Sequence, residues 1–455
     1  MRNSKREFIS LAVALAAILM LVANMFQGRI FATADDDVYE SLEIFSMALD
    51  IVQREYVSEV SSDKLIRGAL YGMLGSLDQH SAYMTRSLHT RLMDETRGEY
   101  EGVGIQLQVP KRPWAPISLG NPLVVRKVFP GTPAFRSDIM EGDAIIKVGG
   151  ETTEGMSQDD AVDKIKGPRG TKVTLTMQRI VGESAEDART SEFDVELERA
   201  KIPLLSVPHA EMSDDGIGYI RLADFKESST EELTSKITEL KDNGMKALVL
   251  DLRYNPGGLL STAANVADLF LPKGDVIVST KKDREPDQRM TYRSNREPLL
   301  TKEECPMAVL VNKDSASGSE IVTGALQDHN RAIVVGTTTY GKSSVQMVSP
   351  LPGESALKIT TAYYYTPREK RLSGVGVQPD IPVILPEKDY YALRRQLPDD
   401  RDVVTAEAVS PDSPEEKVDD IQLKEAKTVL RGYVILASQE KPEEEQEAIA
   451  AEETM

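Results

Sequence analysis

Two short apolar runs with one helix between them constrain the fold of this chain more than any other feature. The runs occupy 307–311 and 332–335, and the segment 320–327 between them repeats its apolar residues at helical spacing, with Ser319 expected as the N-cap. β-Branched residues and a closing Gly336 favour strands for both runs. A strand, helix and strand joined this tightly predict a right-handed crossover between parallel strands. The turns after the two strands should therefore open on the same edge of one sheet.

Each of these two turns carries a residue suited to nucleophilic catalysis. Ser317 lies in the small-residue turn SASGS, and Lys342 lies in the turn after the second strand. A serine hydroxyl needs a positioned base, and a lysine can be that base where an apolar setting keeps its amine neutral. Ser317 also precedes a helix N-terminus, where free N–H groups favour a developing oxyanion. Gln346 can point back at the amine of Lys342 and fix its orientation. Together, these features predict a serine nucleophile with a lysine base.

The second turn also matches a nucleotide-binding pattern. Residues 336–343 read GTTTYGKS, which fits GxxxxGK[ST] and follows an apolar strand. A phosphate-binding loop of this kind leads into a helix whose N-terminus holds the phosphates. Here the chain continues with β-branched residues and stops at Pro350, which predicts a strand. A P-loop nucleotidase is therefore the weaker hypothesis for this stretch.

The whole stretch resembles the active-site region of the carboxyl-terminal processing peptidases, also called tail-specific proteases. That family combines an SASASE turn, a helix ending in DxxRA and a GxxT[FY]GKxxVQ turn. The resemblance implies that Ser317 is the nucleophile, that Lys342 is the base and that Gln346 orients the lysine. It also implies an α/β fold whose core is the crotonase-like β-β-α fold of the Clp-type proteases. Gly318 stands where the family usually has alanine, which leaves the backbone N–H in place.

Another glycine-rich turn follows the apolar run 247–252. The sequence RYNPGG at 253–258 leads into a helix expected over 260–270. A glycine pair at a strand-to-helix turn brings bare backbone N–H groups to the edge of the sheet. The resemblance implies that Gly257 or Gly258 supplies one oxyanion donor and that the N–H of Gly318 supplies the other. A plain strand–helix turn is the structural alternative for this motif taken alone.

Residues 98–200 form a β-rich unit. Strands are expected at 106–109, 123–128, 144–148 and 172–179, with a helix at 157–165. This order resembles a PDZ domain. The resemblance implies that the loop of Gly102, Val103, Gly104 and Ile105 offers backbone N–H groups to the carboxylate of a protein C-terminus, while the following strand pairs with the peptide backbone.

The N-terminus predicts export. Three basic residues within the first six positions precede an apolar run at 8–26, and ATA at 32–34 resembles a cleavage site. The run is also nearly long enough to span a bilayer, so an uncleaved inner-membrane anchor is equally consistent with it. Residues 1–34 are therefore interpreted as an export signal or membrane anchor. The remaining chain is expected in the periplasm, or attached to the inner membrane and facing the periplasm.

Residues 35–97 are expected to be helical for the most part. They contain the sequence LDQHSAY at 77–83, which is similar to the family's LDPHSxY signature with Gln79 in place of proline. His80 in this corner is interpreted as a structural histidine that caps or hydrogen-bonds the turn. His329, at the far end of the crossover helix, is the other candidate base and is expected to lie away from Ser317.

The peptidase core is expected over 201–386, with an exposed charged hairpin at 279–297, and an acidic C-terminal tail over 387–455. From residue 399 onward the chain holds 17 acidic and 6 basic residues, which account for −11 of the net charge of −19. One short helix is expected at 420–436, and the tail is interpreted as solvated, without an assigned function.

These observations predict an exported serine endopeptidase that recognises protein C-termini through its PDZ domain and cleaves through an acyl-enzyme on Ser317. The net charge of −19 argues against nucleic acid as a partner. The single cysteine, Cys305, excludes an internal disulfide and is expected to pack in the core. No metal or nucleotide cofactor is implied. A catalytically inactive PDZ adaptor is the main alternative, and a homo-oligomer stays open.

Overall fold

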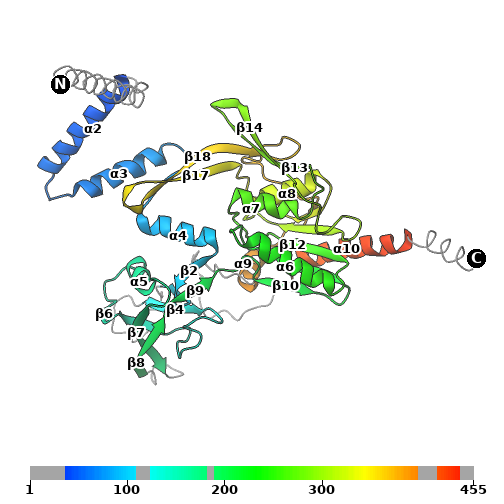
Figure 1. Ribbon diagram of the computed structural model, residues 1–455, viewed down its shortest axis with the longest axis horizontal. Coiled ribbons are helices and arrows are strands. Elements are labelled where there is room, and N and C mark those ends of the chain that lie inside the picture. The colour runs from blue at the N-terminus through cyan, green and yellow to red at the C-terminus, as the bar shows by residue number, and fades with distance from the viewer. Residues whose placement is uncertain (1–35, 109–122, 182–188, 398–417, 441–455) are drawn as a thin grey trace, which may run out of the picture. The chain divides into compact units, whose positions relative to one another are not determined.

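The computed structural model describes residues 36–108, 123–181, 189–397 and 418–440 (Figure 1). The chain divides into two compact units, with the boundary between Tyr83 and Met84. The predicted export segment, 1–34, lies outside the described residues. Within the described ranges, no helix combines the length and the apolar character that a membrane span needs.

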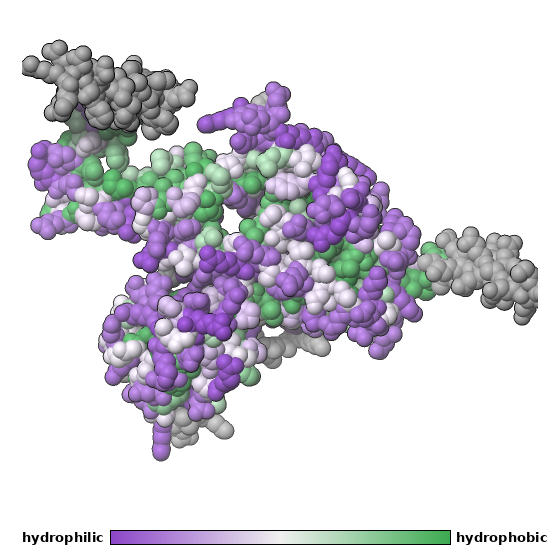
Figure 2. Space-filling view, in the orientation of Figure 1, coloured by the Kyte–Doolittle hydropathy of each residue, from purple (hydrophilic) through white to green (hydrophobic). Residues whose placement is uncertain are grey.

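The first unit contains two helices, α2 (Asp36–Glu55) and α3 (Ser62–Gly75), followed by the short strand β1 (Ala82–Met84) at its boundary. Ser61 caps α3 because its hydroxyl accepts the N–H of Lys64 at 3.3 Å. Many apolar side chains of this unit are exposed, and Figure 2 shows them as green among the purple polar residues. They include Leu42, Ile44, Phe45, Met47 and Ile51 on α2 and Tyr71 and Met73 on α3. The helices predicted for this region are confirmed.

The second unit opens with α4 (Arg86–Arg97) and continues into the β-rich unit that the sequence indicated. Its antiparallel sheet has the order β3-β4-β5-β7-β8. The elements are β3 (Ile105–Gln108), β4 (Leu123–Val128), β5 (Ala144–Val148), β6 (Glu151–Thr152), α5 (Gln158–Ile165), β7 (Lys172–Val181) and β8 (Arg189–Glu198). Strands β2 (Glu99–Gly102) and β9 (Ala200–Pro203) pair antiparallel where the chain enters and leaves this unit. Strand β8 was not predicted, because its side chains are mostly exposed and carry little apolar signal.

The part of the chain from residue 209 onward is organised on a sheet of order β10-β11-β12-β15-β16-β19. Its strands are β10 (His209–Met212), β11 (Ile217–Arg221), β12 (Ala247–Asp251), β15 (Met307–Val311), β16 (Ile333–Gly336) and β19 (Ile381–Pro382). Strands β11, β12, β15 and β16 run parallel, so the predicted parallel pairing of the two strands that flank the crossover helix is confirmed. Every side chain of β11, β12 and β15 is buried, as expected for a sheet covered on both faces.

Helices cover the two faces of this sheet. On one face lie α6 (Ser229–Asp242), α7 (Leu260–Asp268) and α8 (Gly318–Asp328), which share a core with alternate residues of the strands, among them Leu248, Leu250 and Val309. On the other face Ala426 and Leu430 of α10 (Ile421–Glu440) pack against Val249 and Leu310. The described part of residues 387–455 is therefore not the solvated tail with one short helix that the sequence predicted. It contains α9 (Glu387–Gln396) as well, and α10 belongs to the core because its buried side chains recur at helical spacing.

A second sheet, which is antiparallel, belongs to the same part of the chain. The hairpin of β13 (Val276–Lys282) and β14 (Glu285–Arg293) is the one predicted from the charged segment 279–297. Strand β13 also pairs with β18 (Ala356–Tyr365), which pairs with β17 (Ser344–Pro350), and the short 3-10 helix η1 (Pro352–Glu354) joins β17 to β18. This layer receives the chain directly after the turn that carries Lys342.

Candidate active site

The turn between β15 and α8 positions Ser317. The helix begins at Gly318 with Ser317 as its N-cap residue, so the expectation that Ser319 is the N-cap is wrong. The hydroxyl of Ser319 instead donates to the carbonyl of Asn255 at 2.9 Å, because the neighbouring glycine-rich turn lies against it. Ser317 therefore lies at the N-terminus of the helix. There the first N–H groups have no partner within the helix, and the positive end of the helix dipole has its strongest effect.

Ser317 adopts a backbone conformation that non-glycine residues rarely use. Its φ is 53° and its ψ is −109°. Tyr254, in the glycine-rich turn after β12, also has a positive φ of 59°. Such conformations persist only where surrounding contacts enforce them, and they concentrate at functional sites. Here the contacts run between the two turns, since Ala316 donates its N–H to the Asn255 carbonyl at 3.0 Å and the Ser315 hydroxyl donates to Leu252 at 2.8 Å.

The glycine pair lies directly against the serine turn. A Cβ atom on Gly257 would lie 2.6 Å from the Cβ of Ser317 and 2.8 Å from the nitrogen of Gly318, so no larger residue fits. The N–H of Gly257 donates to Oδ1 of Asn255 at 2.8 Å. Because this N–H is already engaged, Gly258 is the better candidate of the two for an oxyanion donor.

A buried carboxylate joins the serine turn to the lysine turn. Glu320, on the first turn of α8, has no exposed surface. Its carboxylate accepts hydrogen bonds from five groups, namely the N–H of Ser317 (2.9 Å), the N–H of Gly341 (2.7 Å), the N–H of Lys342 (2.9 Å), the hydroxyl of Thr339 (2.6 Å) and the hydroxyl of Tyr364 (3.2 Å). Burial raises the pKa of Glu320 above its ordinary value, and hydrogen bonds from Thr339, Gly341, Ser317 and Lys342 oppose that effect. The two turns predicted to face each other therefore share one acceptor.

Sequence reasoning missed Glu320. The signal was present, since a serine followed three residues later by glutamate at the start of an apolar helix is the capping-box pattern. The expected N-cap at Ser319 hid this pattern, because the spacing from Ser319 leads to Val322 instead. Counting from Ser317 would have identified the glutamate.

Strand β17 begins at Ser344, immediately after the GKS of the lysine turn. The turn-then-strand prediction is confirmed, and the loop 336–343 does not lead into the helix that a phosphate-binding loop requires.

Gln346 lies in β17 next to a register irregularity. Its amide nitrogen donates to the hydroxyls of Ser344 at 2.8 Å and Thr360 at 3.3 Å, so it is held along the β17–β18 pair. Its role toward Lys342 stays a prediction.

The two candidate histidines have structural partners. In the first unit Asp78, not His80, organises the corner: its Oδ1 accepts the N–H of His80 at 2.7 Å and of Ser81 at 2.8 Å. His329 is the C-cap residue of α8, at the opposite end of that helix from Ser317. Its Nε2 lies 2.8 Å from the carbonyl of Val276. His329 therefore lies away from Ser317, as predicted.

In the PDZ unit, the predicted carboxylate loop leads into an edge strand. Val103 is buried, and Gly104 has a φ of 86° with a Cβ position that would lie 2.2 Å from Thr132. The carbonyl of Gly104 accepts the N–H of Phe129 at 3.0 Å, which holds the loop against the unit. Strand β3 begins at Ile105 and is the edge of its sheet. An edge strand that follows such a loop can accept an added peptide strand.

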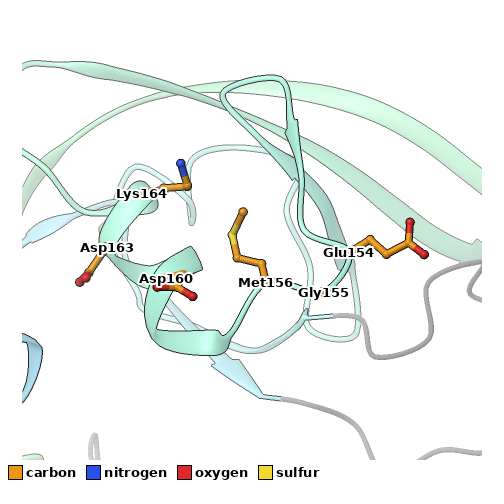
Figure 3. Close-up of a pocket in the computed structure, with 6 residues that line it drawn as sticks. All are labelled: Glu154, Gly155, Met156, Asp160, Asp163 and Lys164. Atoms are coloured by element: carbon orange, nitrogen blue, oxygen red, sulfur yellow. The ribbon is translucent and has the colours of Figure 1, made fainter. Parts of the chain in front are cut away.

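A hollow of about 480 Å³ lies elsewhere in the PDZ unit, beside α5 (Figure 3). It is lined by Glu154, Gly155, Met156, Asp160, Asp163 and Lys164. Figure 3 shows Met156 between the helix and the segment that carries Glu154. None of the residues predicted for catalysis or peptide binding lines this hollow.

Comparisons with known proteins agree with this architecture. Residues 216–383 match the model of peptidase family S41, residues 91–178 match the PDZ domain, and residues 24–87 match the N-terminal domain of the activating protease CtpB. The carboxy-terminal-processing protease of Bartonella bacilliformis is 35% identical over 95% of this chain and 96% of its own length. A probable CtpA-like serine protease of Staphylococcus aureus is 30% identical over 85% of this chain and 74% of its own length.

Among solved structures, the photosystem II D1 C-terminal processing protease is 27% identical to this chain. It covers 74% of this chain and 92% of its own, with a TM-score of 0.40. The identity and coverage of the Bartonella relative decide the family, and the sheet order and the PDZ unit are consistent with it. This chain belongs to the carboxy-terminal-processing proteases of peptidase family S41, and it is a serine-type endopeptidase with a PDZ domain.

Proposed function

We propose that this protease is exported and cleaves proteins that it captures by their C-termini, with Ser317 and Lys342 as a catalytic dyad. Neutral Lys342 takes the hydroxyl proton as Ser317 Oγ attacks the scissile carbonyl. The tetrahedral intermediate collapses as the protonated lysine gives its proton to the leaving amine. Water then attacks the acyl-enzyme, again with Lys342 as base, and the free serine is restored.

The observation that carries this proposal is the shared acceptor Glu320. One carboxylate accepts the N–H of Ser317 and the N–H of Lys342, each at 2.9 Å. Because the backbones of Ser317 and Lys342 bind the same carboxylate, the side chains of these two residues begin at neighbouring positions. This arrangement supports a direct proton transfer between Ser317 and Lys342, and it does not require a histidine.

The N–H groups of Gly318 and Gly258 are the oxyanion donors in this proposal. Gly318 is the first residue of α8, so its N–H has no partner within the helix. A donor pair built from backbone N–H groups needs no reorganisation as charge develops on the carbonyl oxygen. The close approach of Gly257 to Ser317 supports this placement.

Substrate capture is assigned to the edge strand β3 and the loop 102–105. A free C-terminal carboxylate would be held by the loop, and the residues before it would add to β3. Export is assigned to the basic and apolar N-terminus at 1–34, which serves either as a cleaved signal or as an inner-membrane anchor.

Single substitutions test the dyad on an unfolded protein substrate with a free apolar C-terminus. We expect Ser317→Ala and Lys342→Ala each to lower kcat by at least about 10³-fold, as removal of a nucleophile or base does in other serine proteases. Lys302→Ala is the matched control, because Lys302 is exposed in the loop before β15. Full activity in Lys342→Ala would exclude Lys342 as the base.

Two further measurements test capture and export. The same substrate with an amidated C-terminus should show a raised KM, since the loop 102–105 would lose its anionic ligand. A reporter that is active only outside the cytoplasm, fused after residue 40, should be active with residues 1–34 and inactive without them. An unchanged KM, or an inactive reporter in both fusions, would contradict the corresponding part of the proposal.

A further inference from the structure

Arg253 is a buried arginine at the start of the glycine-rich turn. It follows β12 by two residues, precedes the glycine pair, and has no exposed surface. A guanidinium cannot lose its proton under ordinary conditions, so its burial requires partners of opposite charge. The identity of these partners shows which part of the chain the turn depends on.

The first partner is Asp251, on β12 itself. Nε and Nη2 of Arg253 donate to the Asp251 carboxylate at distances of 2.7 to 3.1 Å, and the side chains of both residues are 0% exposed. Tyr219 donates its hydroxyl to the same carboxylate at 2.7 Å. This pair is local, since both residues belong to one strand and the turn that follows it.

The second partner is Asp420, the residue that precedes the distant C-terminal helix α10. Nη1 and Nη2 of Arg253 donate to the two oxygens of Asp420 at 2.8 and 2.7 Å, which is the bidentate geometry of a strong arginine–carboxylate pair. Gln422 accepts a third bond from Nη1 at 3.1 Å and donates to the carbonyl of Val383 at 2.7 Å. Asp420 also caps α10, because Oδ1 accepts the N–H of Leu423 at 3.0 Å. The hydrogen bonds of Arg253 to Asp420 and Gln422 thus connect the beginning of α10 to the turn after β12.

The contacts of Arg253 continue into the glycine pair. Its carbonyl accepts Nη1 of Arg221 at 3.1 Å. Two residues later, Asn255 donates its side-chain amide to the carbonyl of Leu222 at 2.8 Å and accepts the N–H of Gly257. Arg253, Asn255 and Gly257 therefore form one short, fully bonded stretch that ends against Ser317.

We propose that Asp420, the residue before α10, is a positioning residue for catalysis, and that the start of the C-terminal helix fixes the position of the glycine-rich turn 253–258 through Arg253. This inference rests on the proposed oxyanion role of the glycine pair. The helix acts from the opposite face of the sheet from α8, so it does not touch substrate. Without Asp420, the guanidinium keeps Asp251 but loses the bidentate partner that fixes its Nη1 and Nη2 ends.

The test compares two neighbouring aspartates in the full-length protein. Asp420→Asn keeps the size of the side chain but turns an amide N–H₂ toward a guanidinium that can only donate. Asp419→Asn is the matched control, because Asp419 is 63% exposed and pairs with Lys424 instead of Arg253. Both variants remove one negative charge from the same helix start, but only Asp420→Asn changes the contact with Arg253. The N-cap bond to Leu423 is retained in principle, because the side-chain oxygen of asparagine can also accept it.

We expect Asp420→Asn to lower kcat about tenfold, with KM within about twofold of the wild type, because misplacement of a catalytic group by a fraction of an ångström has effects of this size. A peptide boronic acid, which forms a tetrahedral adduct with a serine nucleophile, should bind about tenfold more weakly for the same reason. Asp419→Asn should match the wild type in both assays. Thermal unfolding confirms that each variant is folded at the assay temperature.

Unchanged kcat and boronate affinity in folded Asp420→Asn would overturn the proposal, and so would an equal loss in Asp419→Asn. If Asp420→Asn does not fold, Gln422→Met removes the 3.1 Å contact with Arg253 together with the 2.7 Å bond to the carbonyl of Val383. It should lower kcat and boronate affinity about threefold, and unchanged values would overturn the proposal. Failure of the proposed dyad gives a different result, because activity would then survive in Ser317→Ala. Failure of the Asp420 proposal alone leaves Ser317→Ala inactive and Asp420→Asn fully active.

Discussion

The backbone N–H of Lys342 donates to the buried carboxylate of Glu320 at 2.9 Å. The lysine turn and the first turn of α8 are joined by this bond, and the same oxygen accepts the N–H of Ser317. The relation between the proposed nucleophile and the proposed base is thus fixed by a third residue, to which the proposed mechanism gives no chemical role. We therefore expect Glu320 to be the position of the site that is most sensitive to a conservative substitution.

Glu320→Gln should separate positioning from chemistry. Glutamine keeps the shape but replaces one acceptor oxygen with an N–H₂ group that faces N–H and O–H donors. We expect kcat to fall by about 10- to 100-fold and the free energy of unfolding to fall by about 1–3 kcal/mol, because buried donors lose their partner. Steady-state kinetics and urea unfolding measure both.

The control for this variant is Glu231→Gln, at the exposed first turn of α6. It removes the same charge from the same position of another helix and should leave both quantities unchanged. Wild-type kcat in Glu320→Gln would show that the two turns keep their arrangement without this carboxylate.

Gly257→Ala should abolish catalysis through a steric contact. An added Cβ would lie 2.6 Å from the Cβ of Ser317, whereas the same addition at Gly274 meets no atom within 4 Å. Both glycines have a φ of 99°, so the backbone strain of the two substitutions is matched. We expect each variant to lose about 1–2 kcal/mol of stability from strain, and only Gly257→Ala to lose activity, by about 100-fold or more.

The measurement is kcat/KM beside the free energy of unfolding for both variants. Equal activity of Gly257→Ala and Gly274→Ala would mean that the glycine turn can move away from Ser317 without harm. Such a result would also remove the support that the close approach of Gly257 to Ser317 gives to the proposed oxyanion donors.

Local patterns predicted the crossover well. The bounds of β15 agree with the predicted 307–311, because five consecutive apolar residues at the centre of a parallel sheet leave a clear signal. The approach of the two turns followed from the handedness of the crossover, which sequence rules capture. Glu320 as their shared acceptor did not follow, since its five partners come from three separate segments.

Long-range packing was the part that the sequence could not show. Strand β8 has few buried side chains, so periodicity gives it little weight. Helix α10 sits in a stretch of acidic composition, which outweighed the apolar spacing of Ala426 and Leu430. The choice between Gly257 and Gly258 depended on a hydrogen bond from one N–H to the Asn255 side chain, which no spacing rule encodes.

The buried thiol of Cys305 should make stability depend on alkaline pH. Burial raises the pKa of Cys305 from 9.0 to about 11, and Arg331 partly opposes this effect. The folded state then binds the thiol proton more tightly than the unfolded state, so this contribution to stability is complete below pH 9 and is lost as pH rises to 11. By the linkage relation it reaches the order of 2 kcal/mol.

Urea unfolding of the wild type and of Cys305→Ala at several pH values between 8 and 11 measures this contribution. Other groups titrate over the same range, but they are common to both proteins. We expect the difference in unfolding free energy to shift in favour of the variant as pH rises. A difference that is constant with pH would show that the thiol keeps an ordinary pKa in the folded protein.

A buried ion pair gives the last prediction. Lys226 and Asp224 are nearly buried, with side chains 5% and 8% exposed, and their charged atoms lie 2.9 Å apart. The ammonium also donates to the carbonyl of Leu204 at 2.9 Å, and the Asp224 carboxylate accepts the hydroxyl of Ser206 at 2.8 Å. We expect Lys226→Met to cost about 3–5 kcal/mol of stability, because it leaves a buried carboxylate without its partner charge. The double variant Lys226→Met/Asp224→Asn should recover part of this loss, since the amide needs no counter-charge. Urea unfolding of the two single variants and the double variant completes the cycle, and strictly additive losses would show that the two side chains do not stabilise each other.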